Sequence, residues 1–140
     1  MIRKTFWFLV LAIMFSPHFA IADHVAQENA AVIAAENWLA MVDAGRYAES
    51  WQEASELFRN AVTLAQWKQS LQGARKPLGK LIKRKVRTTT YKTSLPGAPD
   101  GKYVVIEFDT SFEKKKSALE TVTPMMEKDG KWKVSGYYIK

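Results

Sequence analysis

The C-terminal third of the chain alternates apolar and polar residues. Between positions 103 and 112, a row of Val104, Ile106, Phe108, Thr110 and Phe112 alternates with Tyr103, Val105, Glu107, Asp109 and Ser111. A period of two is typical of a strand that buries one face. Asp100-Gly101 and Asp129-Gly130 flank the strands, and Asp-Gly pairs supply the positive backbone angles of a two-residue hairpin. The pattern predicts a three-stranded antiparallel meander over residues 101–140.

The final strand of this meander follows the Asp129-Gly130 turn. Strict alternation places Trp132, Val134 and Tyr138 on one face of that strand. We therefore expect Trp132 to be a core residue.

Upstream of the meander, apolar residues recur at helical spacing in three segments. The expected helices cover residues 27–44, 47–58 and 64–76. Gly45 favours the end of the first helix, because glycine is preferred at the C-terminal cap. Thr63 and Gln66 have the capping-box spacing at the start of the third helix.

A fourth strand is predicted over residues 80–93, which are rich in Thr, Val and basic residues. Residues 95–101 contain two prolines and two glycines, so they are expected to form a loop. Helices followed by antiparallel strands are the order of an α+β protein. The expected fold is therefore three N-terminal helices packed on a curved four-stranded antiparallel sheet.

The first 22 residues have the pattern of a cleaved secretory signal. Two basic residues precede an apolar run over residues 6–15, and Ala20 and Ala22 supply small side chains for cleavage. A membrane-spanning helix needs about 20 apolar residues, and polar residues and a proline interrupt this run. We expect cleavage between Ala22 and Asp23. The product would be one α+β domain over residues 23–140, periplasmic or secreted, with no transmembrane segment.

Composition restricts the chemistry of this mature segment. It contains no cysteine and one histidine, His24, so Ser-His-Asp triads, Cys-His dyads and His/Cys zinc sites are excluded. Its glycines do not have the spacing of a phosphate-binding loop. No cofactor or metal is expected, and no catalytic residue is assigned.

Carboxylates remain as candidates for acid–base chemistry. Glu107 and Asp109 share a strand face, but they point away from the helices if the apolar row points toward them. Glu120 shares a face with Val122 and is expected on the apolar side of the sheet. A partner such as Arg75 or Arg84 would make Glu120 structural.

Four residues are candidates for lining a ligand pocket between the helices and the sheet: Trp51, Arg75, Tyr103 and Glu120. The alternative is that the aromatic side chains are packed core. Arg75, at the end of the third helix, could bond the last carbonyl groups or face a ligand anion.

Two clusters of basic residues define a second candidate surface. They are Lys80, Lys83, Arg84, Lys85 and Arg87, and Lys114, Lys115 and Lys116. Lys83, Lys85 and Arg87 alternate onto one strand face, which could be a solvated face that protects an edge strand. Alternatively, they form a site for an anionic surface if the clusters are neighbours, since their potentials then add. No aromatic residues interleave with them, so a nucleic-acid stacking platform is not expected.

Several motifs in order resemble the bacterial domain-of-unknown-function family numbered 4019. They are Trp38-Leu39, Val42-Asp43, Gly45, Tyr47, Ser50-Trp51, Arg75-Lys76-Pro77-Leu78-Gly79, Leu95-Pro96-Gly97, Pro99-Asp100-Gly101, Glu120-Thr121-Val122 and the run from Asp129 to Ile139. The resemblance implies an exported or envelope domain related in shape to cystatin-like and nuclear-transport-factor-like folds. The family carries no established activity.

Three functions are compatible with these patterns. The first is a non-enzymatic binding or accessory domain for an envelope protein or small ligand, with the exposed sheet as a possible homodimer surface. The second is a pocket enzyme of the isomerase or dehydratase type, using Glu120 or Glu107. The third is a basic adaptor for an anionic envelope polymer or lipid. The formal charge of +7 falls to +5 without the signal, which suits an anionic partner, and nucleic acid is not expected outside the cytoplasm.

Overall fold

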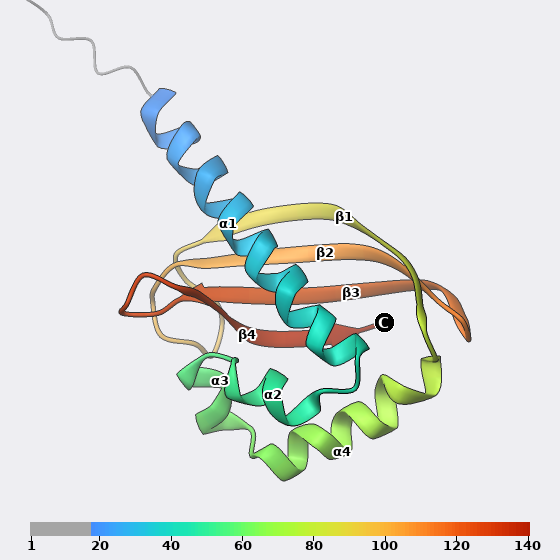
Figure 1. The fold of residues 1–140 in the computed structure, drawn as a ribbon. Coiled ribbons are helices and arrows are strands. Elements are labelled where there is room, and N and C mark those ends of the chain that lie inside the picture. Colours follow the sequence, from blue (N-terminus) through green and yellow to red (C-terminus); the bar gives the residue numbers. More distant parts are fainter. Residues whose placement is uncertain (1–17) are drawn as a thin grey trace, which may run out of the picture.

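One long helix, α1 (His18–Asp43), lies across a face of a four-stranded sheet in the computed structural model, which describes residues 18–140 (Figure 1). The strands are β1 (Leu81–Lys92), β2 (Tyr103–Phe112), β3 (Lys115–Met126) and β4 (Trp132–Ile139). They pair antiparallel in the order β1-β2-β3-β4. The predicted α+β class, with the helices N-terminal to a four-stranded antiparallel sheet, is confirmed.

Helix α1 is longer than predicted, because it begins at His18 and extends beyond β1 at its N-terminal end (Figure 1). Two contacts attach the N-terminal half of α1 to β1. The Thr89 hydroxyl donates to Glu28 at 3.0 Å, and the His24 ring stacks on Tyr91 with centroids 4.4 Å apart. Residues 1–17 of the expected signal lie outside the described residues, so its cleavage stays a prediction.

The predicted helix over residues 47–58 is wrong. Two short helices, α2 (Tyr47–Gln52) and α3 (Glu56–Ala61), replace it and gather beside β4 (Figure 1). Ser55 separates them, because its backbone is extended and its hydroxyl caps α3 by accepting from the Phe58 N–H at 3.1 Å. The Ser55 N–H also donates to the Val134 carbonyl of β4 at 2.8 Å. A tertiary contact therefore breaks the helical pattern.

The remaining helical segment is α4 (Leu64–Ala74), followed by a 3-10 turn, η1 (Lys76–Leu78). The predicted capping box is present: the Thr63 hydroxyl accepts from the Gln66 N–H, and the Gln66 side chain accepts from the Thr63 N–H. Gly45 follows α1 with φ 75°, as expected for a residue that ends a helix.

The predicted faces of β2 are confirmed. Val104, Ile106, Phe108 and Phe112 are buried and, apart from Phe112, belong to the main core cluster with Trp38 and Leu39 of α1. Asp109 is exposed on the other face. Tyr103 is also buried because the 95–101 loop covers it, and its hydroxyl donates to the Pro99 carbonyl at 2.5 Å.

The turn between β3 and β4 differs from the predicted two-residue hairpin. The Glu127 N–H donates to the Lys131 carbonyl and the Gly130 N–H to the Glu127 carbonyl, so three residues lie inside the loop. Gly130 has φ 81°, whereas no non-glycine residue among residues 18–140 has a positive φ. One glycine in the left-handed region is what a three-residue loop with a bulge requires.

The predicted face of β4 is correct for Trp132 and Val134 but wrong for Tyr138. Thr123 pairs with Gly136 and Pro124 with Val134, which leaves Ser135 as an extra residue. The Ser135 hydroxyl donates to the Thr123 carbonyl at 2.7 Å. Such a bulge reverses, for the rest of the strand, which side chains point toward the core and which point away from it. Tyr137 therefore faces the core beside Trp38, and Tyr138 is 62% exposed.

Candidate functional site

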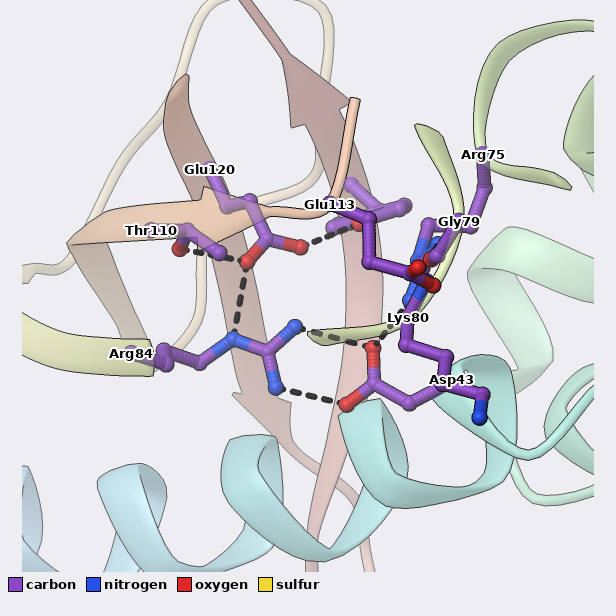
Figure 2. A network of polar contacts seen from close by, with 9 residues as sticks. Asp43, Arg75, Gly79, Lys80, Arg84, Thr110, Glu113 and Glu120 are labelled. Atoms are coloured by element: carbon purple, nitrogen blue, oxygen red, sulfur yellow. Dashed lines mark hydrogen bonds and ion pairs between the residues drawn. The ribbon is translucent and has the colours of Figure 1, made fainter. Parts of the chain in front are cut away.

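A buried carboxylate, Glu120 of β3, lies at the centre of a polar network between the sheet and the C-terminal end of α1 (Figure 2). Its Oε1 accepts from Arg84 Nε at 2.8 Å and from the Thr110 hydroxyl at 2.6 Å. Its Oε2 accepts a short hydrogen bond from the Tyr137 hydroxyl. The side chain is fully buried, and both of its oxygens have donors from the protein.

Arg84 extends this network to α1. Its Nη1 and Nη2 donate to the two carboxylate oxygens of Asp43 at 2.7 and 3.0 Å (Figure 2). Arg75 donates to the same carboxylate at 3.1 Å and to the Gly79 carbonyl at 2.6 Å. The Arg75 guanidinium also lies 4.3 Å from the centroid of the Phe112 ring. Two arginines and two carboxylates thus connect α1, η1 and the sheet.

The electrostatics of the network fix the protonation states of Arg84 and Tyr137. Burial alone lowers the pKa of Arg84, but its hydrogen bonds to Asp43 and Glu120 outweigh burial and raise that pKa. Burial and the nearby Glu120 charge raise the pKa of Tyr137. Arg84 therefore stays charged and Tyr137 stays a hydrogen-bond donor at neutral pH.

The four predicted pocket residues do not line one pocket. Arg75 and Glu120 belong to the same network, joined through Asp43 and Arg84. Trp51 lies in α2, where its indole N–H donates to the Val62 carbonyl at 2.7 Å. Tyr103 lies at the start of β2 beneath the 95–101 loop. Each side chain has a structural contact within the fold.

Sequence reasoning missed three network residues: Asp43, Thr110 and Tyr137. A signal existed for Thr110, a polar residue in an otherwise apolar strand row. The part played by Asp43 depends on two arginines 32 and 41 positions away. Tyr137 reaches Glu120 through the bulge at Ser135, which alternation does not predict.

Three residues of the two predicted basic clusters meet on the sheet face opposite α1, whereas Arg84 of the first cluster lies in the buried network. Lys83 and Lys85 of β1 and Lys116 of β3 line one open depression of about 280 Å³, which we call the basic depression. Ser111 and Ser117 line it as well. The potentials of these three lysines therefore add.

Asp109 is the acidic residue of the basic depression. Arg87 lies outside the depression at a bulge in β1 and forms an ion pair with Asp109 at 3.7 Å. Within residues 18–140, no carboxylate lies within 4.0 Å of the ammonium groups of Lys83, Lys85 or Lys116. The three lysines have no acidic partner in that part of the chain.

A larger groove of about 470 Å³ lies between α1 and the start of β4. Ile33, Trp38, Met41 and Trp132 form its apolar part, and Glu53 and Lys131 are among its polar residues. In the described part of the chain, no helix is long and apolar enough to cross a membrane. Residues 18–140 also contain no group of three His, Asp or Glu side chains placed to hold a metal ion.

Comparison with known proteins identifies one family. The model of the family described as "Protein of unknown function (DUF4019)" matches residues 34–137, which include the whole polar network and the basic depression. No curated protein and no solved structure matches the chain. The match spans most of the chain and agrees with the ordered motifs found in the sequence, so this protein belongs to the DUF4019 family.

Proposed function

We propose that this protein is an exported, non-enzymatic binding domain that docks on an anionic envelope surface through the basic depression. The observation that carries the proposal is the convergence of Lys83, Lys85 and Lys116 without an acidic partner among the described residues. These lysines come from strands that β2 separates in the sheet. Three ammonium groups in one concavity produce a positive potential that attracts an anionic partner.

The net positive charge of the whole domain also favours an anionic partner. The expected mature chain has a formal charge of +5, so long-range attraction to an anionic surface adds to the local potential of the depression. Arg87 compensates the negative charge of Asp109, which lies beside the lysines. The pattern of the first 22 residues supports export.

The polar network argues against proton transfer by Glu120. A general base needs a lone pair directed at the substrate. Arg84, Thr110 and Tyr137 donate to the two oxygens of Glu120 inside the protein. Glu107, the other candidate base, lies on the face of β2 away from the core. The network has the character of a structural connection.

We further infer that the family is related in shape to the cystatin-like and nuclear-transport-factor-like folds. The position of α1 across an antiparallel sheet supports this inference (Figure 1). The N-terminal position of the helices in the chain supports it as well.

The docking proposal is tested by removing charge from the depression. The triple variant Lys83→Gln/Lys85→Gln/Lys116→Gln is compared with wild type for retention on lipopolysaccharide or anionic vesicles at low and moderate salt. We expect a loss of roughly thirtyfold to a hundredfold at low salt, because each of the three basic residues near an anionic surface contributes up to about 1 kcal/mol and counterion release makes the interaction salt-dependent. The melting temperature should change little, since exposed charges add little to stability.

A matched control is the variant Lys68→Gln/Lys76→Gln/Lys128→Gln. It removes the same charge from three exposed lysines outside the depression. Its retention should fall much less than that of the first variant. Equal retention of wild type and both variants at both salt concentrations would overturn the docking proposal. Export is tested separately, by the intact mass of the protein in the periplasmic fraction, where the chain should begin at Asp23.

A further inference from the structure

We propose that the basic depression recognises a phosphomonoester group displayed on a lipid surface, in preference to a phosphodiester or a carboxylate. This inference rests on the proposed function, because it names the chemistry of the anion at the same site.

The charge of the site favours an anion with more than one negative charge. Lys83, Lys85 and Lys116 contribute three cations to one depression, and Arg87 offsets Asp109 at its side. A phosphomonoester carries about −1.5 to −2 charges at pH 7, with three strong acceptor oxygens. A phosphodiester or a carboxylate carries one. The phosphomonoester therefore gains more from the same three ammonium groups.

Two hydroxyl groups add neutral donors to the site. Ser111 and Ser117 line the depression beside the lysines. Thr110 also lines it, but its hydroxyl already donates to Glu120. Lysine binds phosphate as a point charge, and serine hydroxyls donate to phosphate oxygens. Phosphate oxygens can accept from both kinds of donor in this depression.

The size and position of the depression favour a headgroup. Its volume of about 280 Å³ is at the lower end for small-molecule sites, which suits one compact group rather than several units of a chain. In the backbone register of β1 and β2, Lys83 lies opposite Ser111 and Lys85 lies opposite Asp109, so the site is part of the sheet face away from α1. Figure 1 shows α1 on the other face and α2 and α3 beside β4, so none of the helices within residues 18–140 covers this side of the sheet.

The test measures binding to vesicles whose zeta potentials are equal. One set contains phosphatidic acid, a phosphomonoester, in phosphatidylcholine, and the other contains phosphatidylglycerol, a phosphodiester. Equal surface potential removes the difference in non-specific attraction. We expect wild type to bind the phosphatidic acid vesicles roughly threefold to fivefold more tightly, because of the extra charge at the site. The Lys83→Gln/Lys85→Gln/Lys116→Gln variant should lose this preference.

A gain-of-function variant keeps the test independent of folding defects. Asp109→Asn removes the acidic charge of the depression and releases Arg87. This variant should bind phosphatidic acid vesicles more tightly than wild type by roughly threefold to fivefold, the effect of one charge near the surface. Glu113→Gln is the matched control, because it removes one exposed carboxylate outside the depression. Glu113→Gln should leave the affinity for phosphatidic acid vesicles nearly unchanged.

The outcomes separate this inference from the docking proposal. Equal binding of wild type to both vesicle sets would overturn recognition of a phosphomonoester on a lipid and leave anionic docking intact. No binding to either set, together with no retention on lipopolysaccharide, would overturn both. If inorganic phosphate, but not acetate at the same ionic strength, bound the depression without any preference for phosphatidic acid vesicles, the lipid surface would be the wrong source of the phosphate.

Discussion

Arg84 of β1 forms a bidentate ion pair with Asp43, the last residue of α1, with N–O distances of 2.7 and 3.0 Å. A carboxylate is unfavourable at a helix C-terminus, where the helix dipole is negative. Arg84 and Arg75 together compensate that charge. The same Arg84 also bonds the buried Glu120, so one guanidinium attaches the long helix to the interior of the sheet.

Replacing Arg84 by methionine should therefore destabilise the protein strongly. Arg84→Met leaves the fully buried Glu120 without its cation, and breaking a buried pair in this way costs about 3–5 kcal/mol. Urea denaturation at pH 7 measures the change. Arg87→Met is the control, because its ion pair with Asp109 is exposed, and we expect a change within about 0.5 kcal/mol. Equal losses in the two variants would contradict the structural importance of the network.

The bulge at Ser135 predicts that two adjacent tyrosines contribute very differently to stability. Tyr137→Phe removes a hydrogen bond to a buried carboxylate and should cost about 1–3 kcal/mol. Tyr138→Phe changes an exposed side chain and should be within about 0.5 kcal/mol of wild type. Denaturation midpoints of the two variants test the bulge. A larger loss for Tyr138→Phe would mean that β4 has the strict alternation that its sequence suggests.

The raised pKa of Tyr137 predicts that stability decreases in alkali. The folded protein retains this phenolic proton at a pH where the unfolded chain has released it, near pH 10. The stabilisation is complete below that pH and is lost as the pH rises toward the higher pKa of the folded state. Melting temperatures from pH 8 to 11 should therefore fall less steeply for Tyr137→Phe than for wild type. Identical slopes would contradict the shifted pKa.

Two tryptophans should differ in their contribution to stability. Trp67 is 6% exposed and packs edge-on against Phe58, so Trp67→Ala should cost about 3–5 kcal/mol. Trp132 is partly buried and lines the groove beside α1, so Trp132→Ala should cost less, about 1–3 kcal/mol. Chemical denaturation of both variants measures the difference. A larger loss for Trp132→Ala would mean that this side chain is closed inside the core.

Much of the fold follows from local signals in the sequence. The alternation along residues 103–112 determined which face of β2 is buried, because successive strand residues point to opposite sides. Thr63 and Gln66 determined the start of α4, and Gly45 the end of α1, because each cap involves groups only a few residues apart. The order of helices before strands determined the α+β class.

The tertiary structure decided the features that depend on distant partners. Ser55 ends a helical pattern because its N–H bonds Val134, 79 positions later. The extra residue at Ser135 exchanges Tyr137 and Tyr138 between the two faces of β4.

In the candidate sites too, the sequence identified individual residues, and the tertiary structure determined their partners. Glu120 was identifiable as an inward carboxylate from its spacing to Val122, but its partners were not, because Arg84 lies 36 positions away. The basic residues were visible as two clusters, but only the pairing of β1 with β2 and of β2 with β3 brings Lys116 beside Lys83 and Lys85. Sequence periodicity reports the face of each strand. Contact between strands depends on register, which the packing of the whole sheet determines.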